Sequence, residues 1–246
     1  TTDTSNGTVV TSFSELTAAV TKAEKAGGGI VYVKGSSISC TAQLALKASN
    51  ANVSIIGVKN SDGTYPVLDF SAFRSAYIGK ATTDSEVGIR ISGSNYTIKN
   101  LIIQKAPDNG IQIKGSSAGN NTIENCMVRY NNDAGVQITG GAYSNTMRFV
   151  YSYRNCDVYT LGGNADGFAP KLGAGKGNVF YGCYSWENSD DGWDSYDKDS
   201  LTYNLTYTNC ACWNNGDPTI FTGEYDYNNG NALDTDLLLV ELISKK

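Results

Sequence analysis

The chain has 246 residues and a formal charge of −5, and 40% of its residues are hydrophobic whereas 17% are charged. This composition excludes a disordered chain and a generic nucleic-acid binder, which needs an excess of Lys and Arg, and no apolar run approaches the roughly 20 residues of a membrane span. Histidine is absent, which excludes hydrolases with a histidine base and most zinc enzymes. We therefore expect a turn-rich globular domain whose chemistry uses carboxylates, amines, Tyr or Cys.

The first predicted element is an amphipathic helix within residues 11–29. Ser12 and Glu15 have the spacing of a capping box, Leu16 begins one apolar face, and the glycines at 27–29 predict the end of the helix. Short apolar runs then predict strands at 30–33, 53–56 and 67–70. A helix in this position would cap the open end of a repeat structure.

A repeat of about 25 residues occupies the middle of the chain. Apolar residues at 101, 126 and 183 are each followed nine positions later by glycine, and gap-free alignment extends the equivalent positions to 150 and 210. About eight extra residues lie near 156–164. Short alternating strands separated by Asn and Gly at this period are typical of a parallel β-solenoid, which is an all-β fold.

The composition changes from Asp234 onward to DTDLLLVELISKK, which lacks the Asn and Gly of the repeats. We expect a single, monomeric domain over 1–246 in which 234–246 forms an atypical C-terminal tail.

Aligned residues of successive coils should lie about 4.8 Å apart, so the alignment predicts contacts. One such ladder consists of cysteines (Cys126, Cys183 and Cys210) and another of aromatic residues (Tyr153, Trp186 and Trp213). We interpret the cysteines as inward-facing small hydrophobic groups, with a bridge or metal site as the alternative. We interpret the aromatic residues as a structural stack, with a sugar-binding platform as the alternative.

A third ladder consists of carboxylates. Asp166 and Asp191 each precede an aligned glycine of adjacent coils, and Asp190 and Asp194 lie close by in sequence. An isolated Asp-Gly is usually a turn, but carboxylates stacked at strand spacing repel each other unless they are protonated or bridged by a cation. Oxygen ligands on loops suit Ca²⁺ better than Zn²⁺ or Mg²⁺. The pattern predicts a calcium site, with Asp133 as a weaker candidate for an outer ligand.

The strings APDNGIQIKG (106–115), NADGFAPK (164–171) and GNVFYGCYSWENSDDGWD (177–194) resemble the pectate lyases of polysaccharide lyase family nine, and the resemblance covers roughly 90–231. It implies a right-handed parallel β-helix, secretion, and calcium-dependent β-elimination in polygalacturonate or a related uronate polysaccharide. It also implies which residues hold the calcium ion: Asp166, Asp190, Asp191 and Asp194.

The resemblance ends at Asn231. The catalytic lysine of the family lies in a stretch similar to GNGFKLGG, whereas this chain has NGNALDTD at 229–236, which places Asp234 about where that lysine is expected. We therefore expect a chain that is truncated or altered after residue 231. Lys171, five residues after Asp166, is the predicted substitute base. Three further lysines are alternatives whose default role is a solvated surface charge: Lys114, Lys176 and Lys198.

Three functions follow from this sequence. The leading hypothesis is a calcium-dependent pectate lyase. The alternative is a non-catalytic, calcium-stabilised β-helix that binds pectate but lacks a base. A β-helical polygalacturonase is a third possibility, but the GHG and RIK motifs that such hydrolases carry, by resemblance, do not occur in this chain.

Overall fold

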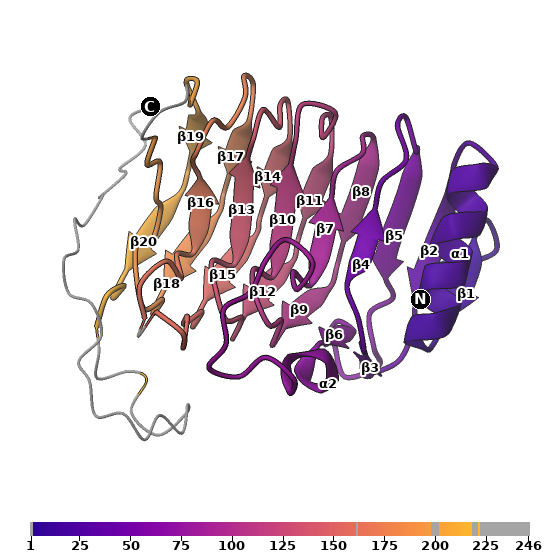
Figure 1. Cartoon of the computed structure of the whole chain (residues 1–246). Coiled ribbons are helices and arrows are strands. Elements are labelled where there is room, and N and C mark those ends of the chain that lie inside the picture. The colour runs from indigo at the N-terminus through magenta and orange to yellow at the C-terminus, as the bar shows by residue number, and fades with distance from the viewer. Residues whose placement is uncertain (1, 161, 198–201, 218–220, 222–246) are drawn as a thin grey trace.

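The structure, a computed structural model, describes residues 2–160, 162–197, 202–217 and 221 (Figure 1). Helix α1 (Phe13–Lys25) lies at one end of the stack of strands and covers the first coil, as predicted. Ser12 Oγ accepts a hydrogen bond from Glu15 N, and the Glu15 carboxylate accepts one from Ser12 N, so the capping box is present. The helix is shorter than the predicted range. No helix among the described residues is long and apolar enough to span a membrane.

Short strands of the described residues form three parallel sheets. The eight-stranded sheet consists of β1 (Thr8–Val10), β2 (Gly29–Val33), β5 (Val53–Gly57), β8 (Tyr96–Lys99), β11 (Thr122–Glu124), β14 (Thr146–Arg148), β17 (Val179–Tyr181) and β19 (Thr206–Thr208). The seven-stranded sheet consists of β3 (Ser37–Ser39), β6 (Val67–Asp69), β9 (Ile102–Gln104), β12 (Met127–Arg129), β15 (Tyr151–Tyr153), β18 (Tyr184–Trp186) and β20 (Ala211–Trp213). The five-stranded sheet consists of β4 (Leu44–Leu46), β7 (Ile89–Ile91), β10 (Ile111–Lys114), β13 (Val136–Thr139) and β16 (Phe168–Pro170).

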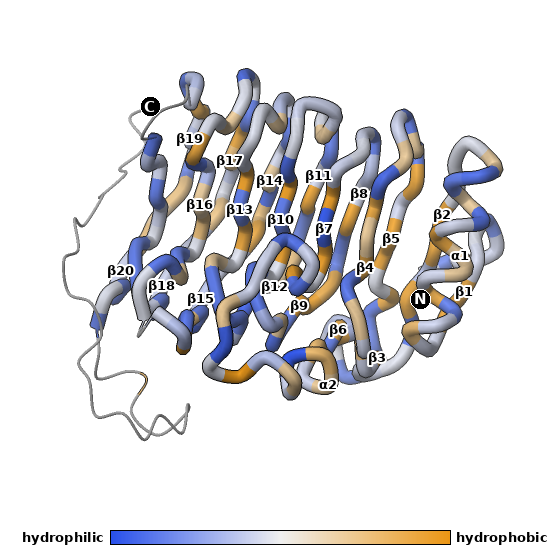
Figure 2. Tube along the Cα trace, in the orientation of Figure 1, coloured by the Kyte–Doolittle hydropathy of each residue, from blue (hydrophilic) through white to orange (hydrophobic). Residues whose placement is uncertain are grey.

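From β2 to β16 each coil of the chain passes through the three sheets in turn, and a second short helix, α2 (Ser71–Arg74), lies in one connection. Buried apolar side chains of the strands form one continuous core. Along the chain, apolar residues concentrate in the strands, whereas the turns are largely polar (Figure 2). The chain is therefore an all-β, right-handed parallel β-helix, as the sequence predicted, with the hand that parallel crossover connections adopt.

The register confirms the repeat alignment. Ile102, Met127, Tyr151, Tyr184 and Ala211 are successive partners in the seven-stranded sheet, so the aligned positions 101, 126, 150, 183 and 210 are structurally equivalent.

The repeated glycine has a steric cause. A Cβ atom at Gly135 would lie 1.9 Å from Ser152 Oγ, and one at Gly167 would lie 1.8 Å from Ser185 Oγ. The glycine that precedes a strand of the five-stranded sheet therefore leaves room for an inward side chain of the next coil.

Two asparagine ladders close the turns. In one, Asn131 N donates to Asn155 Oδ1 and Asn155 N donates to Asn188 Oδ1, both at 3.1 Å. In the other, Asn121 N donates to Asn145 Oδ1 at 3.1 Å. The side-chain amides continue the same ladders from coil to coil. Because these residues are buried, each ladder supplies partners for backbone groups that water cannot reach.

The cysteine ladder is an interior feature. Cys126, Cys183 and Cys210 are buried free thiols that pack in the core, which confirms the predicted inward position.

The aromatic ladder is a stack of parallel rings. Tyr153 and Trp186 have ring centroids 4.4 Å apart, and Trp186 and Trp213 have theirs 5.1 Å apart, with interplanar angles of 7° and 2°. Rings in this arrangement cover each other's faces, and these faces are the surfaces on which a sugar ring would pack. The geometry therefore favours the structural interpretation over the sugar platform.

Candidate metal centre

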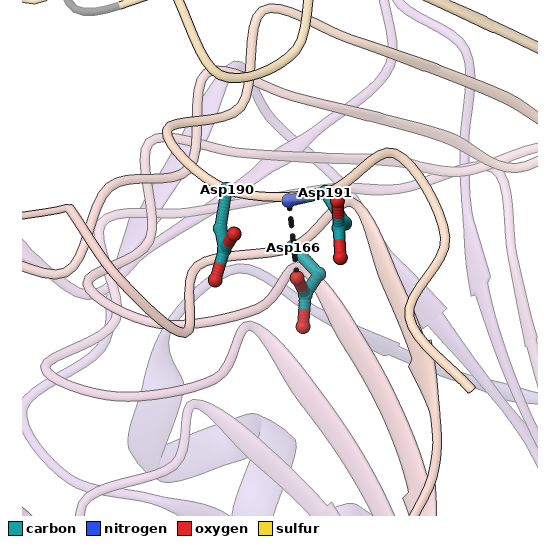
Figure 3. A group of neighbouring side chains, drawn as sticks. All are labelled: Asp166, Asp190 and Asp191. Atoms are coloured by element: carbon teal, nitrogen blue, oxygen red, sulfur yellow. Dashed lines mark hydrogen bonds between the residues drawn. The ribbon is translucent and has the colours of Figure 1, made fainter. Parts of the chain in front are cut away.

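The predicted carboxylates gather where the chain enters the five-stranded sheet. Asp166 directly precedes Gly167 and β16, and Gly167 N donates to Asp191 O at 2.8 Å, which confirms that Asp166 and Asp191 occupy equivalent positions of adjacent coils. Asp190 N donates to Ala165 O in the same way. Figure 3 shows the three carboxylates of Asp166, Asp190 and Asp191 facing a common space. Each offers an oxygen, and these oxygens lie within 4.8 Å of one another.

The surroundings of this group disfavour several negative charges together. Asp166 is fully buried, and burial raises its pKa well above the ordinary value, with the charges of Asp194 and Asp190 adding to the effect. Burial also raises the pKa of Asp191 to about 7, again with contributions from Asp190 and Asp194. A bound cation would compensate this crowding of negative charge.

Asp194 stands apart from the other three predicted ligands. Lys171, which follows β16, places its Nζ 2.9 Å from Asp166 Oδ2 and 2.6 Å from Asp194 Oδ2. The ammonium group therefore joins Asp194 to Asp166. Burial lowers the pKa of Lys171, but the two carboxylates outweigh burial and raise the pKa above its ordinary value.

Further carboxylates continue the centre toward the amino-terminal coils. Asn109 Nδ2 donates to Asp133 Oδ1 at 3.1 Å, and burial, followed by the charges of Asp108 and Asp157, raises the pKa of Asp133 well above its ordinary value. Asp108 and Asp157 are also buried. The sequence analysis missed these last two residues. The position two residues before the aligned glycine, which Asp108, Asp133 and Asp190 share, is the signal that could have identified Asp108.

The donor set fits calcium. It consists of carboxylate oxygens from two adjacent coils, without a nitrogen or sulfur ligand among the described residues of the group, and hard oxygen ligands are those that Ca²⁺ prefers. Asp166, Asp190 and Asp191 are the residues positioned to hold it. Asp194 lies at the edge of this group, where it pairs with Lys171.

The alternative lysines lie elsewhere. Lys114 pairs with Asp84 at 2.8 Å, and Lys176 lines a groove at the other end of the five-stranded sheet. Lys198, Asp234 and the predicted tail at 234–246 lie outside the described residues.

Comparisons with known proteins agree with the architecture. A family model described as "Pel9A-like, right handed beta helix region" matches residues 1–233. Pectate lyase L of Paenibacillus polymyxa (strain SC2) is 33% identical over 181 residues, which cover 70% of this chain and 38% of that protein. Pectate lyase L of Dickeya dadantii (strain 3937) is 34% identical over 141 residues, which cover 57% of this chain and 27% of the relative. The matched regions thus span well under half of these relatives.

A solved structure is similar as well. The crystal structure of pectate lyase Pel9A matches 92% of this chain and 51% of its own length, with a TM-score of 0.65 and 27% sequence identity. A rhamnogalacturonan lyase, at a TM-score of 0.59 and 22% identity over 77% of this chain and 50% of its own, shares the fold.

Proposed function

The chain belongs to the Pel9A-like right-handed β-helix family of pectate lyases, and from this membership we propose that it is a calcium-dependent lyase that cleaves polygalacturonate by β-elimination. The observation that carries the proposal is the group of three carboxylates from adjacent coils whose oxygens lie within 4.8 Å of one another. We propose that Asp166, Asp190, Asp191 and Asp194 form the calcium site. We also propose that the protein acts outside the cell, because a long polyanion does not cross a membrane. The monomeric state stays a prediction.

The chemistry fits a site without histidine. In β-elimination a base removes the C5 proton of a uronate residue, and the electron pair forms the C4–C5 double bond. The bond from C4 to the glycosidic oxygen breaks, this oxygen takes up a proton from water, and a 4,5-unsaturated sugar remains. Calcium bound next to the uronate carboxylate would stabilise the negative charge that develops when this proton leaves. The acidic residues of this chain position that charge-stabilising group, and the proton needs a separate acceptor.

We propose Lys171 as the base among the described residues. Its Nζ lies at the centre, beside Asp166 and Asp194. These carboxylates favour the protonated ammonium, which cannot accept a proton, so a role as base requires that positive charge near Lys171 offsets them. If Lys171 is the base, replacing it with Ala lowers kcat by a factor of about 10² to 10⁴. Unchanged turnover in Lys171→Ala would remove it from this role.

The decisive experiment follows the ultraviolet absorbance of the unsaturated product during incubation with polygalacturonate. We expect signal with calcium, none with chelator, and none with calcium for Asp191→Asn, because the amide removes one negative oxygen from the site. Asp62→Asn is the matched control, since Asp62 is an exposed turn residue whose bonds to Thr64 an amide oxygen preserves. Equal activity of wild type with and without calcium would contradict the proposal.

One observation favours a second function. Lys171 is held as a counter-ion of two carboxylates, which is a structural role. The second candidate is thus a non-catalytic β-helix that binds pectate through calcium. In that case calcium strengthens the binding of polygalacturonate, Asp191→Asn abolishes this calcium-dependent part of the binding, and the absorbance assay detects no unsaturated product.

A further inference from the structure

A groove of about 670 Å³ lies beyond the C-terminal ends of β13 and β16, whereas the metal centre lies at the N-terminal end of β16. Four of the residues that line it are glycines, Gly140, Gly141, Gly173 and Gly175, so part of the lining is backbone. Its walls carry Tyr143, Leu172, Lys176 and Tyr203. These wall side chains are exposed, with 38% of Tyr143, 44% of Leu172 and 41% of Tyr203 accessible to solvent.

The aromatic walls are fixed by the coils beneath them. A Cβ atom at Gly119 would lie 2.3 to 2.7 Å from three ring atoms of Tyr143, so this ring rests on the backbone of the preceding coil. Tyr203 N donates to Ala174 O at 3.1 Å, and Lys176 Nζ lies 4.7 Å from the centroid of the Tyr203 ring. Lys176 itself is hydrogen-bonded through its carbonyl to Ser144 N. The groove therefore presents Tyr203 and Lys176 on backbone that neighbouring segments hold by hydrogen bonds, with the ammonium beside the Tyr203 ring.

The charge of the groove is opposite to that of the whole chain. The chain has a formal charge of −5, yet the residues that line the groove include no Asp or Glu and include Lys176. Among the described residues, Lys176 forms no ion pair, whereas Lys114, Lys99 and Lys171 each do. An ammonium without a carboxylate partner among the described residues, beside the Tyr203 ring in a groove that Tyr143 also lines, can pair with an anionic ligand that also has an apolar face.

We propose that this groove is a second binding site for a uronate polysaccharide, with Lys176 pairing with a sugar carboxylate and Tyr143 and Tyr203 packing against sugar rings. The choice of polymer rests on the proposed lyase function. The metal centre and the groove flank the same strand, because Asp166 precedes β16 and Leu172 follows it. Asp166 and Leu172 are six residues apart, and an extended backbone of that length spans at most about 20 Å, a distance that one extended polysaccharide chain can cover.

The test is affinity electrophoresis in gels that contain polygalacturonate and chelator, so that calcium-mediated binding is absent. We expect polygalacturonate to retard the wild-type chain, whereas neutral galactan does not. Lys176→Met removes the charge but keeps an apolar stem, and we expect it to weaken binding roughly fivefold, the size of one exposed charged contact. Tyr203→Ala should weaken it similarly.

Lys59→Met is the matched control. Lys59 is also exposed and also lies over a tyrosine ring, 5.7 Å from the centroid of Tyr65, and its replacement changes the net charge equally. We expect this variant to bind like wild type. Equal weakening in both lysine variants, or in neither, would overturn the proposal, because binding would then depend on net charge or on another surface.

The gel needs no turnover, so it separates this proposal from the lyase function. Retardation that depends on Lys176 in a chain without lyase activity would leave the groove as a uronate-binding site and overturn only the proposed function. In an active chain, we expect Lys176→Met to raise KM for polygalacturonate without changing kcat. For trigalacturonate, which is too short to reach the groove, we expect kcat/KM to stay unchanged. An equal loss on trimer and polymer would place the effect outside the groove.

Discussion

At the scale of single residues, the asparagine ladders depend on one oxygen per coil. Asn155 Oδ1 accepts hydrogen bonds from both the backbone N and the side-chain Nδ2 of Asn131, and both asparagines are fully buried. Asn155→Ala leaves these two donors without a partner, and we expect the free energy of unfolding to fall by about 2–4 kcal/mol. Urea denaturation measures this change. The exposed Asn6, whose Oδ1 accepts from Tyr32 Oη, provides the control, and Asn6→Ala should cost under about 1 kcal/mol.

Lys171 has a measurable role as a counter-ion. Its side chain is 11% exposed and pairs with Asp166 and Asp194, so Lys171→Met leaves two carboxylates without their positive partner. In chelator at neutral pH we expect a loss of about 3–5 kcal/mol in the free energy of unfolding. Calorimetric titration should show tighter calcium binding by the variant, because the ammonium repels a cation held by the same oxygens.

Two results would contradict this account of Lys171. Weaker calcium binding by Lys171→Met would mean that the ammonium and the cation do not compete. A similar loss of stability in Lys99→Met would mean that burial is not the cause, because the Lys99 and Glu124 side chains are 38% and 29% exposed and such a solvent-accessible pair contributes under about 1 kcal/mol.

At the scale of the elements, the repeated glycine sets how closely two sheets approach. The Cβ of Gly135→Ala would meet Ser152 Oγ, which donates to Gly167 O at 2.7 Å. We expect overpacking of about 1–3 kcal/mol, measured by urea denaturation. The double variant Gly135→Ala with Ser152→Gly should recover part of this loss, because it removes the clashing atom. Gly163→Ala should be nearly neutral, since the nearest heavy atom is 3.6 Å from the added carbon.

How much of the fold the sequence predicts depends on whether a residue belongs to the repeat. The period predicted the equivalence of positions 101, 126, 150, 183 and 210, and the glycines predicted that Asp166 and Asp191 are neighbours, because a parallel coil gives aligned residues one spacing. The sequence did not predict the bonds of Lys171 or the groove at Lys176. Those depend on how long side chains reach across turns, and turns vary from coil to coil.

At the scale of the whole molecule, the buried carboxylates give the metal-free chain an unusual pH dependence. Burial raises the pKa values of Asp108 and Asp157, and the ordinary unfolded value is near 3.9. The folded state therefore binds more protons than the unfolded state, so the stability from these groups is complete below about pH 4 and is lost as the pH rises through the raised values. In chelator, we expect a higher Tm at pH 5 than at pH 7.

The comparison of variants locates this effect. Replacing both Asp108 and Asp157 with Asn should reduce the difference in Tm between pH 5 and pH 7, measured by thermal unfolding in chelator. Asp62→Asn should leave the difference unchanged, because the pKa of Asp62 is lowered and this carboxyl is ionised throughout that range. A wild-type Tm that rises from pH 5 to pH 7 would show that other groups dominate.

The extra residues between β15 and β16 lie beside the metal centre but do not change the register of the strands. Tyr151 and Tyr184 remain in register across this longer coil, while Asn164 N donates to Asp190 Oδ2 at 2.7 Å and Ser189 Oγ donates to Gly162 O at 2.6 Å. A length change here alters what surrounds the carboxylates without shifting a strand. This connection is thus the natural place for sequence divergence and for loop grafting by design. New binding preferences can arise there while the strands of the β-helix keep their sequence and register.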